Sequence, residues 1–361
     1  MDISHPAARS DSTKVNILLI GLGSIGTIYG YLLEKSGRAR VTAVARSNYS
    51  LYKEHGVRID TDRFGVVDAW RPSRVFKSQE EALADGTHYT FCVLCTKCLP
   101  DVRSNAEVLA PTIESGQVST FLLIQNGLGV EEDLKAAIGS TPLLSCLAWI
   151  SGVTNPAGDV VTWRGIEKLG VGLYPPPSRA QPMCGRSEAA LDMWVSLMKS
   201  ADANVITTDD VVSMRYAKNV WTATQATLQG LTRTPQPCFA LVDESSQQLI
   251  KDFMTEVVAL GYATGLLWEG MTVQPAGTTA GGPESIVQGM WEKFVSKPNP
   301  AKTHKWSMLV DIEQGRPFEV EVVLGAVVKL AQEKNFPVPN TRFAYALMKG
   351  MQQGILHKIQ F

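Results

Sequence analysis

The feature that most constrains this chain is a glycine-rich turn between an apolar segment and a helical segment near its start. Residues 14–26 read KVNILLIGLGSIG, and the following TIYGYLLEKS favours a helix. In a dinucleotide-binding unit the first glycine permits a tight turn, the second lets backbone N–H groups approach a pyrophosphate, and the third lets helix and strand pack closely. Because the flanking segments fit a strand and a helix, we predict a dinucleotide site rather than a plain glycine turn. Its residues would be Gly21, Leu22, Gly23, Ser24, Ile25 and Gly26.

The end of the second predicted strand bears on which dinucleotide binds. The segment ARVTAVARSNYS carries no acidic residue, and Arg46 and Ser47 occupy the place of the acid that usually holds the ribose 2′-hydroxyl of NAD. A guanidinium presents a planar set of donors to phosphate oxygens, and a hydroxyl can add a hydrogen bond. The pattern therefore favours NADPH over NADH as cofactor. The alternative is that Arg46 is a solvated loop arginine.

Composition and charge narrow the class of protein. With 361 residues, 45% of them hydrophobic, the chain can bury two cores. The net charge is −1 and there is no basic stripe, so we expect no binding to nucleic acid or to a membrane surface. Residues 1–14 predict a flexible tail without a signal peptide, and no run of 18 apolar residues follows. We expect a cytoplasmic protein with a small-molecule partner.

Three cysteines, Cys92, Cys95 and Cys98, have a spacing that resembles a metal-ligand cluster. They belong to YTFCVLCTKC, which fits a buried parallel strand, and residues three apart on a strand point to opposite faces. Buried thiols that act as small apolar side chains explain the pattern better than zinc ligands, so we predict no metal site. The other three cysteines are scattered, as expected for reduced thiols inside a cell.

Apolar segments of strand length alternate with helical or turn-rich segments through the first half of the chain. This alternation predicts an α/β fold whose parallel sheet and crossover helices are of the Rossmann type. Residues 151–174 suggest added antiparallel strands, a helical pattern starts at Glu188, and helical patterns dominate after Asp209. We therefore expect a Rossmann NADP-binding domain at 15–208 and an all-α domain at 209–361. The strand segments are KVNILLI, RVTAVA, YTFCVLCT, VSTFLLI and PLLSCLA.

Two segments of the helical half carry polar residues suited to chemistry. In DDVVSMRYAKNVWTATQA, either aspartate can cap a helix that places Lys218, Thr222 and Ala226 on one face. A helical lysine alone is usually a solvated surface charge. In HKWSMLVDIEQGRPFEVEV, Ser307 and Glu319 flank a turn, and the residues after it fit a strand or a helix equally. A carboxylate near an ammonium would hold and orient it.

Taken together, these motifs resemble the ketopantoate reductase family (2-dehydropantoate 2-reductase). The resemblance covers nearly everything from residue 15 onward, and the motifs appear in the family's order. They are GLGSIG, Arg46 after the second strand, Lys97 in VLCTKC, Asn126 in QNGLGVEE, Lys218 in RYAKNVW, and Ser307, Asp311 and Glu319 in SMLVDIEQGRPFEVE.

The resemblance implies NADPH-dependent reduction of a 2-oxo acid in a cleft between a Rossmann domain and a helical domain. Lys218 would be the catalytic proton donor, and Glu319 would orient its ammonium group. Lys97 and Asn126 would lie near the nicotinamide and the substrate, and Ser307 would contact the substrate. Ketopantoate reduction would place the protein in pantothenate biosynthesis.

The chain departs from the family at three positions that bear on the substrate. The well-studied bacterial pattern has asparagines four, eight and eighteen residues after the lysine, where this chain has Thr222, Ala226 and Gln236. Loss of a polar partner at a buried site costs about 1–3 kcal/mol, so three changes can redirect specificity. Thr222 can still donate a hydrogen bond to the substrate through its hydroxyl.

Three functions remain open on the sequence alone. The first is reduction of ketopantoate. The second is NADPH-dependent reduction of another oxo acid, ketone or imine in specialised metabolism. The third is a catalytically silent NADPH-binding sensor, which would not need Lys218 and Glu319. The Gly- and Pro-containing residues 271–300 predict a loop of undefined role, and apolar faces of the last helices leave a homodimer as an open expectation.

Overall fold

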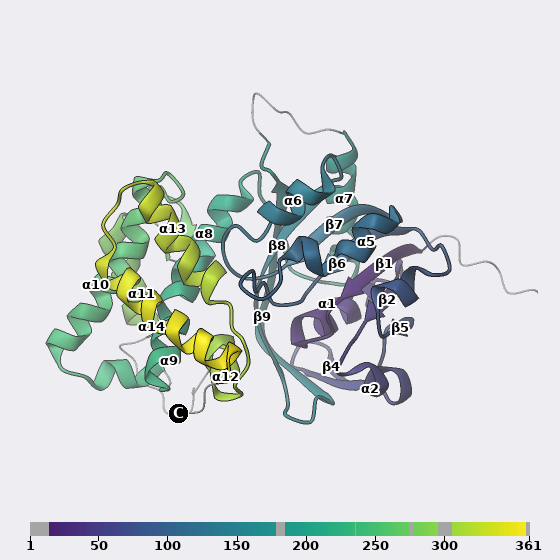
Figure 1. Ribbon diagram of the computed structural model, residues 1–361, viewed down its shortest axis with the longest axis horizontal. Coiled ribbons are helices and arrows are strands. Elements are labelled where there is room, and N and C mark those ends of the chain that lie inside the picture. The colour runs from purple at the N-terminus through teal and green to yellow at the C-terminus, as the bar shows by residue number, and fades with distance from the viewer. Residues whose placement is uncertain are drawn as a thin grey trace, which may run out of the picture.

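The computed structural model describes residues 14–177, 185–234, 236–273, 278–279, 281–294 and 305–358. Figure 1 shows two halves. One half contains a mixed β-sheet with helices packed on it, and the other half is a group of helices. This arrangement confirms the predicted fold class. The tail predicted at 1–14 lies outside the described residues, apart from Lys14. Within the described ranges, no helix is both long enough and apolar enough to cross a membrane.

Parallel strands form the centre of the sheet. Their order is β5-β2-β1-β6-β7-β8, and each neighbouring pair in this path is parallel. Numbered along the chain, this is the 3-2-1-4-5-6 order of a dinucleotide-binding fold. The strands are β1 (Val15–Ile20), β2 (Ala39–Val44), β5 (Arg74–Phe76), β6 (Tyr89–Leu94), β7 (Val118–Ile124) and β8 (Leu143–Thr154). Each of the five predicted strand segments is a strand in the structure.

Additional strands extend the sheet beyond β8. The long strand β9 (Val160–Tyr174) pairs antiparallel with β8, as the sequence predicted for this region. A hairpin of β3 (Val57–Thr61) and β4 (Gly65–Trp70) pairs with β9 through β3, and β10 (Val205–Thr207) also pairs with β9. The sequence did not predict β3, β4 or β5, because these strands are short and the side chains of β4 and β5 are largely exposed or half-buried.

Helices cover both faces of the sheet, so the first half has three layers. One apolar core lies between the sheet and α1 and α7, and a second lies between the sheet and α3, α5 and α6. Cys92 belongs to the second core, whereas Cys95 packs against the first, on the opposite face. Among the described residues, no three His, Cys, Asp or Glu side chains are grouped to hold a metal ion. The helices are α1 (Ser24–Lys35), α2 (Tyr49–Glu54), α3 (Gln79–Leu83), α4 (Asn105–Val108), α5 (Ala110–Ser115), α6 (Glu132–Ile138) and α7 (Gly185–Ser200).

The second half is built mainly from helices. The sequence left open whether the segment after the Gly-Arg-Pro turn is a strand or a helix. In the structure it is helical. The prediction of a loop over 271–300 was wrong for residues 283–294, which form α11; Ile286, Met290 and Trp291 are buried there. The elements are α8 (Val211–Trp221), η1 (Thr222–Ala226), α9 (Thr227–Thr232), η2 (Gln236–Leu241), α10 (Glu244–Ala263), β11 (Thr272–Val273), β12 (Thr278–Thr279), α11 (Pro283–Phe294), α12 (Ser307–Glu313), η3 (Glu321–Gly325), α13 (Ala326–Glu333) and α14 (Pro339–Leu356).

Two of these elements, η1 and η3, are π-helical turns inside longer helices. A π-helical turn is wider than an α-helical turn and is often found at functional sites. Here η1 directly follows the helix that carries Lys218, and η3 begins two residues after Glu319. The two π-helical turns contact each other. The wider turn of η1 lies between Thr222 and Ala226, the last two positions of the face predicted to carry Lys218.

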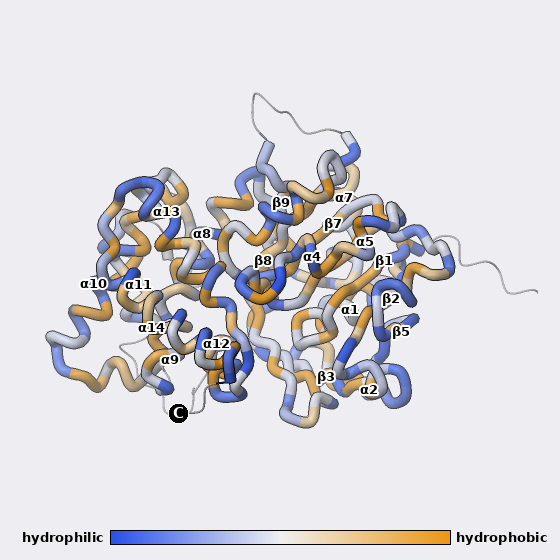
Figure 2. Tube along the Cα trace, viewed as in Figure 1, coloured by the Kyte–Doolittle hydropathy of each residue, from blue (hydrophilic) through white to orange (hydrophobic). Residues whose placement is uncertain are grey.

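The two halves share one apolar core where they meet. Leu94 and Phe121 from the sheet belong to the same buried cluster as Tyr216 and Val220 from α8 and Val323 from η3. Figure 2 shows hydrophobic stretches, coloured orange, along the central strands and within the helical half. The shared core fixes α8 against the carboxyl ends of the central strands.

The N-terminus of α14 is capped by a side chain from another helix. Val338 at the N-cap position provides no side-chain cap, and Pro339 follows it. Instead, the carboxylate of Glu256 on α10 accepts hydrogen bonds from the backbone N–H groups of Asn340 and Thr341, at 3.0 and 2.8 Å. It also accepts from the side chains of both residues. A negative charge at this end also complements the helix dipole.

We expect Glu256→Ala to lower the free energy of unfolding by about 2 kcal/mol, because it removes a charged cap and leaves helix N–H groups without a partner. Chemical denaturation followed by circular dichroism measures this change. The control is Glu333→Ala, which removes an exposed carboxylate 4.0 Å from Lys329 and should cost less than about 0.5 kcal/mol. Equal stability of the two variants would contradict a capping role for Glu256.

Candidate functional site

The glycine turn joins β1 to α1 at the carboxyl edge of the sheet. Gly21 has a positive φ of +98°, which favours glycine, and a Cβ on Gly26 would overlap the Gly21 carbonyl oxygen. A Cβ on Gly23 would meet no atom within 4 Å, and Gly23 caps α1 without a side-chain hydrogen bond. The amino end of α1 is thus open, with backbone N–H groups available to an anion. These observations fit the pyrophosphate of a dinucleotide.

Two further residues lie at this turn and were missed by the sequence analysis. The Asn48 side chain donates a 2.6 Å hydrogen bond to the carbonyl oxygen of Leu22 and so ties the turn to the loop after β2. Thr96 packs against Gly21, and its hydroxyl is buried with no hydrogen-bond partner. A buried hydroxyl beside the turn is suited to hydrogen-bond to a polar atom of a bound ligand. Thr96 lies in VLCTKC next to Lys97, but no role was predicted for it or for Asn48.

The other predicted cofactor residues follow neighbouring strands at the same edge. Arg46 comes after β2 and is exposed, Lys97 comes after β6, and Asn126 comes after β7. Because β2, β1, β6 and β7 are consecutive and parallel, their carboxyl ends form one continuous edge. Open α/β sheets bind ligands along this edge.

Lys218 lies near the end of α8 and reaches this edge from the helical half. Asp210 begins the helix by accepting a 2.9 Å hydrogen bond from the N–H of Ser213, as predicted for one of the two aspartates. The ammonium group of Lys218 donates a hydrogen bond to the side-chain oxygen of Asn126. Two predicted site residues, 92 positions apart in the chain, are therefore in direct contact.

Glu319 completes this group of charged side chains. It is 8% exposed, and its carboxylate accepts a 3.3 Å hydrogen bond from the N–H of Cys98, next to Lys97. Burial raises the pKa of Glu319, and the positive charges of Lys97 and Lys218 oppose this increase. Burial also lowers the pKa of Lys218 to about 8; the charge of Arg215 adds to the decrease and Glu319 opposes it. An ammonium with a pKa of about 8 can release its proton near neutral pH.

Lys97 forms an ion pair across the junction of the two halves. Its partner is Asp311 on α12, which is 2% exposed and also accepts a 2.9 Å hydrogen bond from Arg316. Asp311 lies in the SMLVDIEQGRPFEVE motif, but no role was predicted for it. The pair holds Lys97 beside Glu319 and joins the loop after β6 to α12.

The predicted substrate residues occupy different environments. Thr222 is 8% exposed at the start of η1, and Ala226 is 1% exposed at its end. Ser307 is exposed in the first turn of α12, one turn before Asp311. Its neighbour Trp306 packs edge-to-face on Trp221, with ring centroids 5.9 Å apart. Gln236 begins η2, and the environment of its side chain lies outside what the structure describes.

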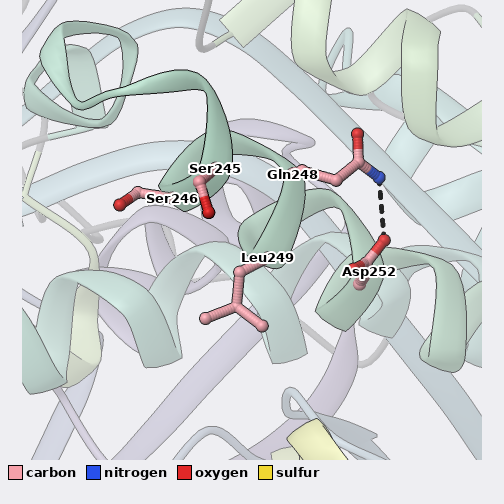
Figure 3. A pocket seen from close by; sticks show the side chains of 5 residues that line it. All are labelled: Ser245, Ser246, Gln248, Leu249 and Asp252. Carbon is pink, nitrogen blue, oxygen red and sulfur yellow. Dashed lines mark hydrogen bonds between the residues drawn. The ribbon is translucent and has the colours of Figure 1, made fainter.

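A shallow hollow on α10 lies outside this constellation. Figure 3 shows the side chains that line it, and the amide of Gln248 donates a 2.8 Å hydrogen bond to Asp252 within the same helix. None of the predicted site residues lines it. Its lining residues are Ser245, Ser246, Gln248, Leu249 and Asp252.

The sheet order, the glycine turn and the helical second half define a two-domain protein of the Rossmann class, with polar groups from both halves at the carboxyl edge of the sheet. Comparison with known families gives the same result. The ketopantoate reductase PanE/ApbA model matches residues 17–176, and the model of its C-terminal part matches residues 210–352. The chain belongs to the ketopantoate reductase family, a family of oxidoreductases.

Individual relatives are similar along almost the whole chain. An uncharacterized protein of Saccharomyces cerevisiae, YDL144C, is 27% identical over 353 residues, which cover 92% of each chain. The crystal structure of 2-dehydropantoate 2-reductase from Methylococcus capsulatus is 26% identical, with a TM-score of 0.73 over 94% of this chain and 98% of that one. D-mandelate dehydrogenase in complex with NADH and anilino(oxo)acetate shares the fold, with a TM-score of 0.72 at 16% identity over 95% of this chain and all of that one.

Proposed function

We propose that this protein is an NADPH-dependent reductase of 2-oxo acids, with Lys218 as the proton donor. The observation that carries the proposal is the contact of Lys218 with Asn126, beside buried Glu319, at the edge of the sheet that also holds the glycine turn. In this proposal residues 15–208 bind the cofactor and residues 209–361 supply the proton donor and most of the substrate contacts.

The chain would bind the cofactor and the substrate at separate parts of this edge. The amino end of α1 and Arg46 would hold the phosphates, and Thr96 would contact the dinucleotide next to Gly21. When bound, the nicotinamide supplies the hydride that reduces the carbonyl carbon. The cofactor residues would be Gly21 to Gly26, Arg46, Lys97 and Asn126, and the substrate residues would be Asn126, Thr222 and Ser307.

Lys218 would donate a proton to the substrate carbonyl oxygen as negative charge develops there. Asn126 accepts a hydrogen bond from the ammonium group and so fixes its direction. The carboxylate of Glu319 would keep Lys218 protonated against the effect of burial. The lowered pKa of Lys218 makes the proton easier to transfer than that of a solvated lysine.

Ketopantoate is the first candidate substrate, because the family is named for that reaction. The absence of the family's amide side chains at Thr222 and Ala226 favours a second candidate, another 2-oxo acid with a less polar side chain. An alanine cannot hydrogen-bond to a substrate hydroxyl, and one such contact can be worth about 1–3 kcal/mol.

The test is the initial rate of NADPH oxidation with ketopantoate and with a series of 2-oxo acids whose side chains range from hydroxylated to aromatic. Preferential turnover of ketopantoate would assign the first substrate, and preferential turnover of an apolar 2-oxo acid would assign the second. NADPH binding without turnover of any oxo acid, ketone or imine would refute a reductase and support a sensor.

Cofactor choice gives a separate prediction. We expect Arg46→Ala to raise the KM for NADPH about tenfold or more and to leave the KM for NADH nearly unchanged, because only the 2′-phosphate needs the guanidinium. Steady-state kinetics with each cofactor measures both values. Arg342→Ala, which removes an exposed arginine on α14, is the control. An equal effect of Arg46→Ala on both cofactors would contradict a 2′-phosphate role.

A further inference from the structure

Arg215 is a buried arginine one turn before Lys218 on α8. Its side chain is 3% exposed, and its Nε lies 2.7 Å from the carboxylate of Glu131, whose side chain is 2% exposed. An arginine and a glutamate are rarely buried unless they are paired. The two side chains come from different halves of the molecule, so this pair crosses their junction.

The guanidinium of Arg215 contacts the backbone on both sides of Asn126. Its Nη1 donates hydrogen bonds to the carbonyl oxygens of Gln125 and Gly127, at 2.7 and 3.1 Å. Its Nη2 donates to the hydroxyl of Ser145, at 2.6 Å, and to a backbone carbonyl of β8, at 3.1 Å. The hydroxyl of Ser145 in turn donates to Glu131. One side chain thus ties the Asn126 loop to β8 and to α8.

A second contact holds the same loop from the other side. The N–H of Leu128 donates a 2.7 Å hydrogen bond to the carbonyl oxygen of Val322 in η3. Gly127 has a positive φ of +93°, and a Cβ there would collide with Val322. Between these two anchors the loop has little freedom, and the Asn126 side chain is directed at Lys218.

We propose that Arg215 is the positioning residue of this site: its guanidinium, neutralised by Glu131, fixes the Asn126 loop against Lys218. The inference rests on the proposed function in that Lys218 and Asn126 are the groups positioned. A buried lysine would not serve, because an ammonium cannot reach both flanking carbonyls and Glu131 with the planar geometry of a guanidinium.

Arg215 also acts on Lys218 through its charge. The charged groups around Lys218 are Arg215 on its own helix and Glu319 from the segment before η3. Glu131 lies against Arg215, and Lys97 and Asp311 act on Glu319. Since the charge of Arg215 lowers the pKa of Lys218, removing that charge should raise it. The positional effect and the charge effect can therefore be separated by two variants.

The first variant, Arg215→Lys, keeps the charge and removes the fork of donors. We expect kcat to fall about 10- to 100-fold, because small displacements of positioned groups have effects of this size. The KM for NADPH and the pH at which activity declines should stay close to wild type. Hydrogen exchange at the Leu128 amide should become faster, because the loop loses one of its anchors.

The second variant, Arg215→Met with Glu131→Gln, removes both charges together, which avoids leaving one of them buried and unpaired. It should show the same faster exchange at Leu128. In addition, the titration midpoint of Lys218, followed by NMR, should move to higher pH. If Arg215→Lys does not fold, this double variant still tests the positioning role of Arg215.

The control is Arg342→Met on the surface of α14, which should change none of these quantities. Wild-type kcat and wild-type exchange at Leu128 in Arg215→Lys would overturn the proposal. So would a variant that loses stability alone, with kcat and the Lys218 midpoint unchanged in the folded protein. Failure of the proposed function would look different: the wild type would reduce no 2-oxo acid, while loop exchange would still respond to both variants and the Lys218 titration to the second variant.

Discussion

Lys218→Met should leave a folded protein whose kcat for reduction of its 2-oxo acid is lower by about 10²- to 10⁴-fold. This is the usual contribution of a positioned general acid. Methionine keeps most of the volume of the side chain but cannot donate a proton or bond to Asn126. Initial rates of NADPH oxidation measure the change, and fluorescence titration with NADPH should show that cofactor binding is retained.

The pH dependence of the wild-type protein provides a second measurement of the same role. The donor must be protonated, and the pKa of Lys218 is lowered to about 8. The rate of reduction should therefore be constant below pH 8 and fall about tenfold per pH unit above it. Lys329→Met, which removes an exposed lysine of α13, should keep both the rate and this profile. Full activity in Lys218→Met would exclude Lys218 as the donor.

Two alanine substitutions in the glycine turn should change different properties: Gly26→Ala should lower stability, and Gly23→Ala should weaken NADPH binding. In Gly26→Ala the new Cβ overlaps the carbonyl oxygen of Gly21 and lies 3.3 Å from the Cβ of Cys95. We expect the free energy of unfolding to fall by about 3 kcal/mol, as in other overpacked sites. Thermal and chemical denaturation measure this loss.

Gly23→Ala should be as stable as wild type, within about 0.5 kcal/mol, since Gly23 has a φ of −79° and its Cβ would meet no atom. The methyl group would instead occupy the space next to the open amino end of α1. We expect the Kd for NADPH to rise about 10- to 100-fold, equivalent to one lost hydrogen bond to a charged group. Unchanged NADPH affinity in Gly23→Ala would contradict a pyrophosphate site at this turn.

Much of the fold could be predicted from the sequence because local patterns and tertiary packing agree in the first half. The buried parallel strands are continuous apolar segments, and the glycine turn marks where β1 ends. The hairpin of β3 and β4 could not be predicted in this way, because β3 has only five residues and β4 is mostly exposed, so neither strand is a continuous apolar segment. The helix α11 was missed because the glycines and prolines around it dominate the composition of that segment.

The candidate site was predictable only in part. Lys218, Asn126 and Glu319 were found through motifs, whereas no role was predicted for Asn48 or for Arg215, although Arg215 lies in RYAKNVW. Arg215 matters because of what surrounds it, and its partners lie 70 to 90 positions away in the chain. The π-helical turns η1 and η3 likewise depend on packing between distant segments, which residue spacing does not report.

The shared apolar core has a consequence for how the molecule loses its structure. Leu94 and Phe121 of the sheet and Val220 and Val323 of the helical half belong to one buried cluster, and the Arg215–Glu131 pair lies across the same junction. Separating the two halves would expose this core to water and break the Arg215–Glu131 ion pair. The two domains differ in topology, but we expect them to unfold together in one cooperative transition, because neither half has a complete interior without the other.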